Sequence, residues 1–161
     1  MGNKFQFQVT TELEALEKIW QWFETITKPL LSEQAFNECR LALTEGFTNA
    51  VRHAHQNFPA TTPIDLEIKL MPQYIEMKIW DRGEYFDIET KLKSLKKNQI
   101  HLLWQEGGNG LKFMEQVTDD LKYIRFSKNK NCLVMRKKVE YGTLLKEQKI
   151  LSFPSYHLPV S

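Results

Sequence analysis

The chain has 161 residues, of which 42% are hydrophobic and 26% are charged. That balance is typical of a single globular domain and is too apolar for an intrinsically disordered chain. The formal net charge of +2 gives no electrostatic reason to expect nucleic acid, so a small ligand or a protein is the more natural partner.

The spacing of the cysteines and the length of the apolar segments indicate the cellular compartment of the protein. Cys39 and Cys132 stand far apart and outside any CxxC pair, so neither a disulfide framework nor a zinc site is expected. No apolar stretch follows Met1, and no run of about 18 apolar residues occurs, so we expect no signal peptide and no membrane contact. These features predict a cytoplasmic protein in a reducing compartment.

The chain begins with a predicted strand and a predicted helix. Residues 4–10 alternate between apolar and polar side chains, which is typical of a strand with one buried face. Thr11 and Glu14 fit a capping box, and apolar residues then follow at helical spacing as far as Phe23. We therefore expect Thr11 to be the N-cap of this first helix.

A second, longer helix is predicted from Ser32, which can serve as its N-cap, to about residues 55–57, because Pro59 cannot continue it. His53 and His55 are two residues apart near its end, whereas a metal-binding pair on a helix prefers a spacing of four. We expect both to be exposed or to interact with the helix dipole. The expected core stripe of this helix consists of Phe36, Cys39, Leu43, Phe47, Val51 and Ala54.

A hairpin and an irregular segment come next. Residues 64–70 and 75–79 alternate in polarity around a Pro-containing turn, which predicts two antiparallel strands. Residues 84–106 show no regular pattern, and long irregular segments in compact domains are often lids or binding loops. The lysines of residues 91–97 in this segment indicate a solvated face, from which one side chain could reach phosphate if the lid closes.

A short helix from Leu111 and a final hairpin, residues 121–126 and 132–139, complete the predicted elements. The order predicts an α/β (α+β) two-layer sandwich, with a mixed, mostly antiparallel sheet and helices on one face. It lacks the strict βαβ alternation of a Rossmann fold. We expect one domain at residues 1–140 and a C-terminal extension at residues 141–161.

Glu45 and Asn49 are the first candidate functional pair. Four residues turn a helix by about 400°, so both side chains project from nearly the same face. A solvated helix face would explain this spacing equally well. As a functional pair, the carboxylate could orient a nucleophile or accept its proton, and the amide oxygen is a ligand suited to Mg²⁺.

Asp81 and Gly83 follow directly on a predicted strand. Both are common turn residues, so a simple turn is one explanation. The functional alternative is that the carboxylate accepts a hydrogen bond from an exocyclic amine such as that of adenine. The glycine would then let a flat ring approach the backbone closely.

A glycine-rich turn opens the last predicted helix. Glycines before a helix leave backbone N–H groups free to face an anion, and the helix dipole favours negative charge there. A flexible hinge is the alternative. Phe113 stands where a GxGxxG motif needs its third glycine, and no Walker A lysine follows. The turn consists of Gly107, Gly108, Asn109, Gly110 and Leu111.

The order and spacing of these groups resemble the GHKL ATPase superfamily. Residues 45–50 resemble its N box, residues 81–87 its G1 box in the DxGxxFD form, and residues 108–111 the GxGL part of its G2 box. Within the superfamily, the short chain and short lid look most like the bacterial anti-sigma factor serine/threonine kinases. The resemblance covers residues 5–139 and implies the Bergerat ATP-binding fold, with an ATP lid at about residues 84–107.

The resemblance also implies roles for individual residues. Glu45 would be the general base or an orienting carboxylate, and Asn49 would hold Mg²⁺. Asp81 would bind the adenine amine, and Gly83 would make room for the ring. The other implied ATP-binding residues are Phe86, Gly107, Gly108, Asn109, Gly110 and Leu111.

The implied function is an ATP-dependent protein serine/threonine kinase that acts as an anti-sigma factor. It would phosphorylate an anti-anti-sigma (STAS-type) protein and sequester a sigma factor, and family members are typically homodimers. A non-catalytic, nucleotide-gated binding module would use the same pocket. The catalytic domain of a split histidine kinase is less well supported, because no dimerisation hairpin with a phospho-acceptor histidine is present. Coincidence of the three boxes is the remaining alternative.

Overall fold

The computed structural model describes residues 3–97 and 109–141. The strands are β1 (Asn3–Thr10), β2 (Pro63–Leu70), β3 (Tyr74–Asp81), β4 (Asp120–Ser127) and β5 (Lys130–Lys138). The helices are α1 (Leu16–Thr27), α2 (Glu33–Asn49), α3 (Ile88–Lys97) and α4 (Asn109–Val117). A 3₁₀ turn, Leu13–Ala15, precedes α1, and a π-helical turn, Ala50–Ala54, extends α2.

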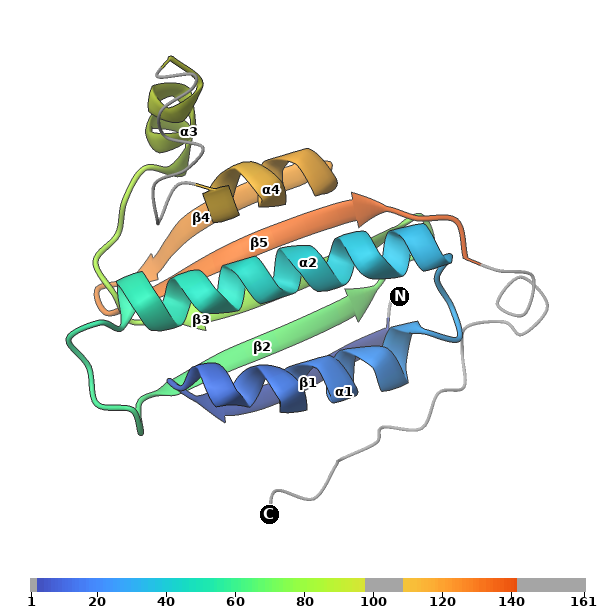
Figure 1. Ribbon diagram of the computed structural model, residues 1–161, viewed down its shortest axis with the longest axis horizontal. Coiled ribbons are helices and arrows are strands. Elements are labelled where there is room, and N and C mark those ends of the chain that lie inside the picture. Colours follow the sequence, from blue (N-terminus) through green and yellow to red (C-terminus); the bar gives the residue numbers. More distant parts are fainter. Residues whose placement is uncertain (1–2, 98–108, 142–161) are drawn as a thin grey trace.

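The strands form one sheet in the order β1-β2-β3-β5-β4, so that β1 and β4 are the edges. Every strand pair in the described part of the chain is antiparallel. Helices α1, α2 and α4 lie over one face of the sheet, whereas α3 stands away from it on the side of β4 (Figure 1). The predicted two-layer sandwich with helices on one face is confirmed.

The core lies between α2 and the middle of the sheet. Side chains alternate across a strand, so β2 places every second residue, from Ile64 to Leu70, against the helices. From α2, Cys39, Leu43 and Phe47 are fully buried against them. Gly46 brings the helix close to the sheet, because an added Cβ would lie 2.8 Å from Cδ1 of Ile79. The described helices include none that is both long and apolar enough to cross a bilayer.

One helix cap follows the prediction and another does not. The Ser32 hydroxyl accepts a hydrogen bond from the Ala35 N–H at 3.1 Å, which confirms it as the N-cap of α2. The capping box at Thr11 is wrong. Glu12 precedes the 3₁₀ turn without a side-chain cap bond, and the Thr11 hydroxyl is buried against His55 instead.

The segment after β3 is more regular than expected, because α3 forms within the predicted irregular lid. Asp87 explains where α3 begins: its carboxylate accepts hydrogen bonds from the Glu89 N–H at 3.0 Å and the Thr90 hydroxyl at 2.9 Å. Residues 98–107 of the expected lid, Gly108 and residues 142–161 of the expected extension lie outside the described residues. Tyr141 is buried, and its hydroxyl donates to the Tyr74 carbonyl at 3.1 Å.

Candidate functional site

The candidate site lies at the end of the sheet where α2 finishes, β3 ends and α4 begins. A cavity of about 50 Å³ lies there. Its lining includes Asn49, Asp81, Phe86, Lys91, Leu111 and Tyr123. A wider and more open depression at the end of α1 is lined by Gln21, Glu24, Thr25, Lys28 and Pro29, none of which belongs to the predicted site.

The first turn of α4 lies directly against the predicted pair on α2. A Cβ added to Gly110 would lie 2.7 Å from Oε2 of Glu45 and 3.5 Å from Oδ1 of Asn49. Burial raises the pKa of Glu45, and the charge of Arg52 opposes that rise. The positive end of the α4 dipole, a carboxylate with raised proton affinity and an amide oxygen therefore meet in one place.

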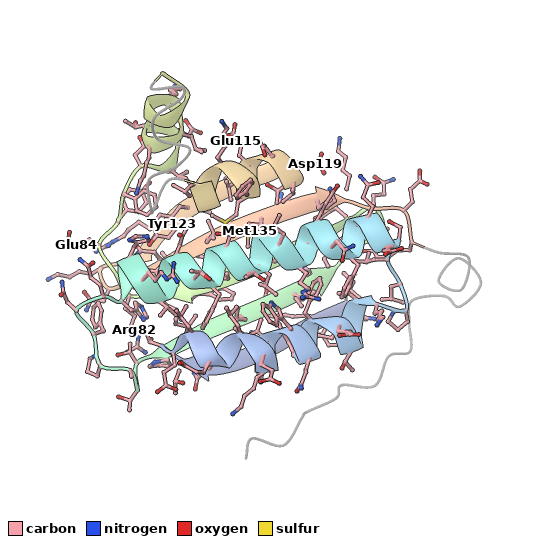
Figure 2. The ribbon with its side chains drawn as sticks, viewed as in Figure 1. Arg82, Glu84, Glu115, Asp119, Tyr123 and Met135 are labelled. Atoms are coloured by element: carbon pink, nitrogen blue, oxygen red, sulfur yellow. The ribbon has the colours of Figure 1, made fainter. Side chains whose placement is uncertain are left out.

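Asp81 is the most heavily hydrogen-bonded group of the site. Its side chain is buried, and Oδ1 accepts from the Gly83 N–H at 2.9 Å and from Nδ2 of Asn131 at 3.0 Å. The Tyr123 hydroxyl lies 2.7 Å from Oδ2 and 2.9 Å from Oδ1. In Figure 2, Tyr123 lies at the same end of the molecule as Arg82 and Glu84. The carboxylate is thus fixed in orientation by three residues.

The sequence patterns did not single out Asn131 or Tyr123. Asn131 pairs with Asp81 across β3 and β5, and its amide also donates to the Gly83 carbonyl at 2.8 Å. It thereby holds both ends of the Asp81–Gly83 turn. In the sequence, Asn131 stands beside the polar residues 128–130 and resembles an ordinary turn residue, although it is the second residue of β5. Tyr123 resembles any half-buried strand residue, so neither carried a recognisable signal.

Gly83 packs on the π-helical turn that follows α2. A Cβ at this position would lie 2.5 Å from the Ala54 carbonyl oxygen, which is closer than any side chain can approach. The bond that defines the π-helical turn runs from the His55 N–H to the Ala50 carbonyl at 2.8 Å. Gly83 is therefore needed for close backbone packing, in addition to any role beside a ligand.

The prediction for His55 is wrong, whereas His53 is exposed as expected. His55 is buried, with Nε2 2.8 Å from the Arg82 N–H and Nδ1 2.9 Å from the Thr11 hydroxyl. The π-helical turn carries its side chain inward, away from the exposed end that a continuous α-helix predicts. Burial lowers the pKa of His55, which favours the neutral ring.

Phe86 and Lys91 line the cavity beside Tyr123. The Phe86 ring lies 4.7 Å from the ring of Tyr123, and the Lys91 ammonium lies 4.8 Å above Phe86. Lys91 is the described lysine of the 91–97 segment that lines the cavity. Leu111 of α4 is buried in the cavity wall.

The structure thus brings together seven of the predicted site residues: Glu45, Asn49, Asp81, Gly83, Phe86, Gly110 and Leu111. Asn109 is the first residue of α4. Gly107 and Gly108 lie outside the described residues.

The residues present fit a magnesium ion that arrives with a phosphate ligand. The described residues contain no cluster of three histidine, cysteine or acidic side chains that would hold a metal alone. Mg²⁺ typically takes one or two protein oxygens and completes its octahedron with phosphate oxygens and water. Oδ1 of Asn49 lies beside the start of α4 and is the kind of oxygen that could serve as such a ligand.

Comparison with known proteins agrees with this geometry. The profile of the histidine kinase-like ATPase domain matches residues 9–137. The serine-protein kinase RsbW of Staphylococcus aureus (strain MSSA476) is 31% identical over 93 residues, covering 56% of this chain and 58% of the relative. RsbW of Oceanobacillus iheyensis is 34% identical over 96 residues, covering 56% and 59%. The chain therefore spans just under three fifths of the length of these curated relatives.

Proposed function

Because this chain belongs to the histidine kinase-like ATPase domain family, we propose that it binds Mg²⁺-ATP and transfers the γ-phosphoryl group to a protein serine or threonine. The proposed nucleotide site is the cavity between α2, α4 and the end of β3. The observation that carries the proposal is the contact of Gly110 with Glu45 and Asn49. It places an anion-attracting helix start beside a carboxylate and a magnesium-compatible oxygen.

The proposed chemistry requires positioning and charge neutralisation more than covalent catalysis. Asp81 accepts the adenine amine, and the N-terminus of α4, together with the glycine turn before it, faces the phosphates. Asn49 supplies a ligand for Mg²⁺, which neutralises phosphate charge when it is bound. Glu45 accepts the proton of the attacking hydroxyl or orients it, a role to which a carboxylate of raised pKa is suited.

The proposed biological role is that of an anti-sigma regulatory factor in the cytoplasm. The chain would phosphorylate an anti-anti-sigma protein of the STAS type and sequester a sigma factor, and it would act as a homodimer. The relatives named serine-protein kinase support the kinase part of this role. Within the chain, residues 1–140 form the proposed kinase domain, residues 84–107 its ATP lid and residues 141–161 an extension.

The decisive experiment replaces Glu45 by Gln and measures nucleotide binding and phosphoryl transfer separately. We expect Glu45→Gln to keep ATP affinity within about threefold and to reduce transfer at least about a hundredfold, because shape is conserved and the proton acceptor is lost. Calorimetry reports the affinity, and radiolabelled ATP with STAS-type substrate proteins reports the transfer. Glu33→Gln, in the first turn of the same helix, is the matched control.

Each result separates one interpretation from another. Normal transfer by the Glu45→Gln protein would remove Glu45 from the mechanism. Tight ATP binding by the unmodified chain without labelling of any candidate substrate would indicate a nucleotide-gated binding module instead. Failure to bind either Mg²⁺-ATP or Mg²⁺-GTP would refute the proposed site.

A further inference from the structure

Tyr123 lies where an adenine base would have to form its hydrogen bond. We infer that the Tyr123 hydroxyl is an internal substitute for the 6-amino group of adenine: it satisfies Asp81 in the ligand-free protein and gives way when the base binds. The inference rests on the proposed function, because it concerns how the same site recognises its nucleotide.

The two oxygens of Asp81 have different partners. Oδ1 accepts from the Gly83 N–H and from Nδ2 of Asn131, at 2.9 and 3.0 Å. Both of these donors are held in place, since one is backbone and the other also bonds the Gly83 carbonyl. Oδ1 therefore has its partners whether or not a ligand is present.

Oδ2 depends on Tyr123. A phenol carries one proton, and the hydroxyl lies closer to Oδ2, at 2.7 Å, than to Oδ1, at 2.9 Å. Among the described residues, no other donor lies within hydrogen-bonding distance of Oδ2. Burial and the neighbouring charge of Asp81 raise the pKa of Tyr123, so the hydroxyl remains a donor at neutral pH. A buried carboxylate oxygen without a donor is costly, so the tyrosine hydroxyl stabilises the buried Asp81 carboxylate.

The space beside Asp81 leads to the same conclusion. The cavity is lined by both Tyr123 and Phe86, so a base that reaches Asp81 lies next to the hydroxyl that it replaces. The Tyr85 ring lies parallel to Tyr123 within 11°, at a centroid distance of 5.7 Å, and the Phe86 ring lies 4.7 Å from it, so the tyrosine ring is held by two aromatic neighbours.

The test is a thermodynamic cycle between one protein hydroxyl and one ligand amine. Calorimetry measures the affinities of ATP and of purine riboside 5′-triphosphate, which lacks the 6-amino group, for the unmodified chain and for Tyr123→Phe. The unmodified chain should prefer ATP by less than about fivefold, because Oδ2 has a donor with either ligand. In Tyr123→Phe the preference for ATP should be about tenfold greater, because only the amine then supplies that donor. Tyr85→Phe removes a hydroxyl from the adjoining ring and should leave the preference unchanged.

The outcomes distinguish the inference from the function on which it rests. A preference that rises less than about threefold in Tyr123→Phe overturns the inference while leaving nucleotide binding intact. Binding by Tyr123→Phe alone overturns both, because the unmodified chain then binds no nucleotide to which its hydroxyl could give way. Absence of binding in every combination overturns both. If Tyr123→Phe does not fold, as judged by circular dichroism, the unmodified chain decides: an ATP preference above about fivefold overturns the inference, and a smaller one supports it.

Discussion

The backbone N–H of Arg82 donates to Nε2 of His55 across 2.8 Å, and this bond determines which ring nitrogen carries the proton. Because Nε2 accepts, the neutral ring must be protonated at Nδ1, which lies 2.9 Å from the Thr11 hydroxyl. That hydroxyl donates its own hydrogen bond to the Thr62 carbonyl at 2.7 Å. The relay ties the end of β1 to the turn that follows Asp81, and it requires a neutral histidine.

Acidification should therefore weaken the fold through His55. Burial lowers the pKa of His55, the Arg82 charge acts in the same direction, and Asp81 opposes them. The unfolded chain takes up a proton near the ordinary value of about 6.5, but the folded chain does so only at lower pH. Stability is thus fully present above about pH 6.5 and falls as the pH decreases towards the folded-state pKa.

Urea denaturation at several pH values tests this dependence. Replacement by Gln retains an acceptor for the Arg82 N–H but removes the titration, so His55→Gln should flatten the loss of stability between about pH 7 and 5. His53→Gln, at the exposed histidine nearby, should retain the slope of the unmodified chain. An unchanged slope in His55→Gln would show that another group causes the acid sensitivity.

Two glycine-to-alanine substitutions should differ sharply in their effect on stability. At Gly83 the new Cβ would meet backbone, 2.5 Å from the Ala54 oxygen, so the π-helical turn must shift. At Gly46 it would meet the ends of the Ile79 and Leu133 side chains, at 2.8 and 2.9 Å, and these can rotate. We expect Gly83→Ala to cost at least about 3 kcal/mol and Gly46→Ala about 1 kcal/mol, since alanine also favours the helix. Equal losses in guanidinium denaturation would contradict this explanation.

Gly110→Ala should separate catalysis from stability. The added Cβ would lie 2.7 Å from Oε2 of Glu45, so the carboxylate must turn away from its position. Alanine favours a helix over glycine by up to about 1 kcal/mol, so the melting temperature should hold or rise slightly. Phosphoryl transfer should fall at least about tenfold, because displacement of a positioned group is costly.

The control for Gly110→Ala is Gln116→Ala, at an exposed position of the same helix. It should leave both the melting temperature and the transfer rate unchanged. A Gly110→Ala protein with normal transfer would show that Glu45 tolerates the crowding, and the contact would then be structural only.

Local patterns in the sequence were sufficient to predict most of the fold. The alternation in β2 and the Ser32 cap of α2 depend on neighbours in the chain, and both are confirmed. The resemblance in three motifs indicated the family that the match to residues 9–137 establishes. The start of α3 could also have been predicted from the sequence. Its capping residue, Asp87, bonds only to Glu89 and Thr90, which lie two and three positions further along the chain. Such features depend on short-range geometry, which the chain encodes directly.

Only the tertiary structure shows how the site is held together. Asn131 and Tyr123 reach Asp81 from 50 and 42 residues away, because the order β3-β5-β4 places β5 beside β3 and β4 one strand further on. The pairing of His55 with Thr11 spans 44 residues and replaces the helix cap that the local pattern favours. A buried polar side chain takes whichever partner the packing brings within reach. That choice depends on strand order and register, which are properties of the whole fold.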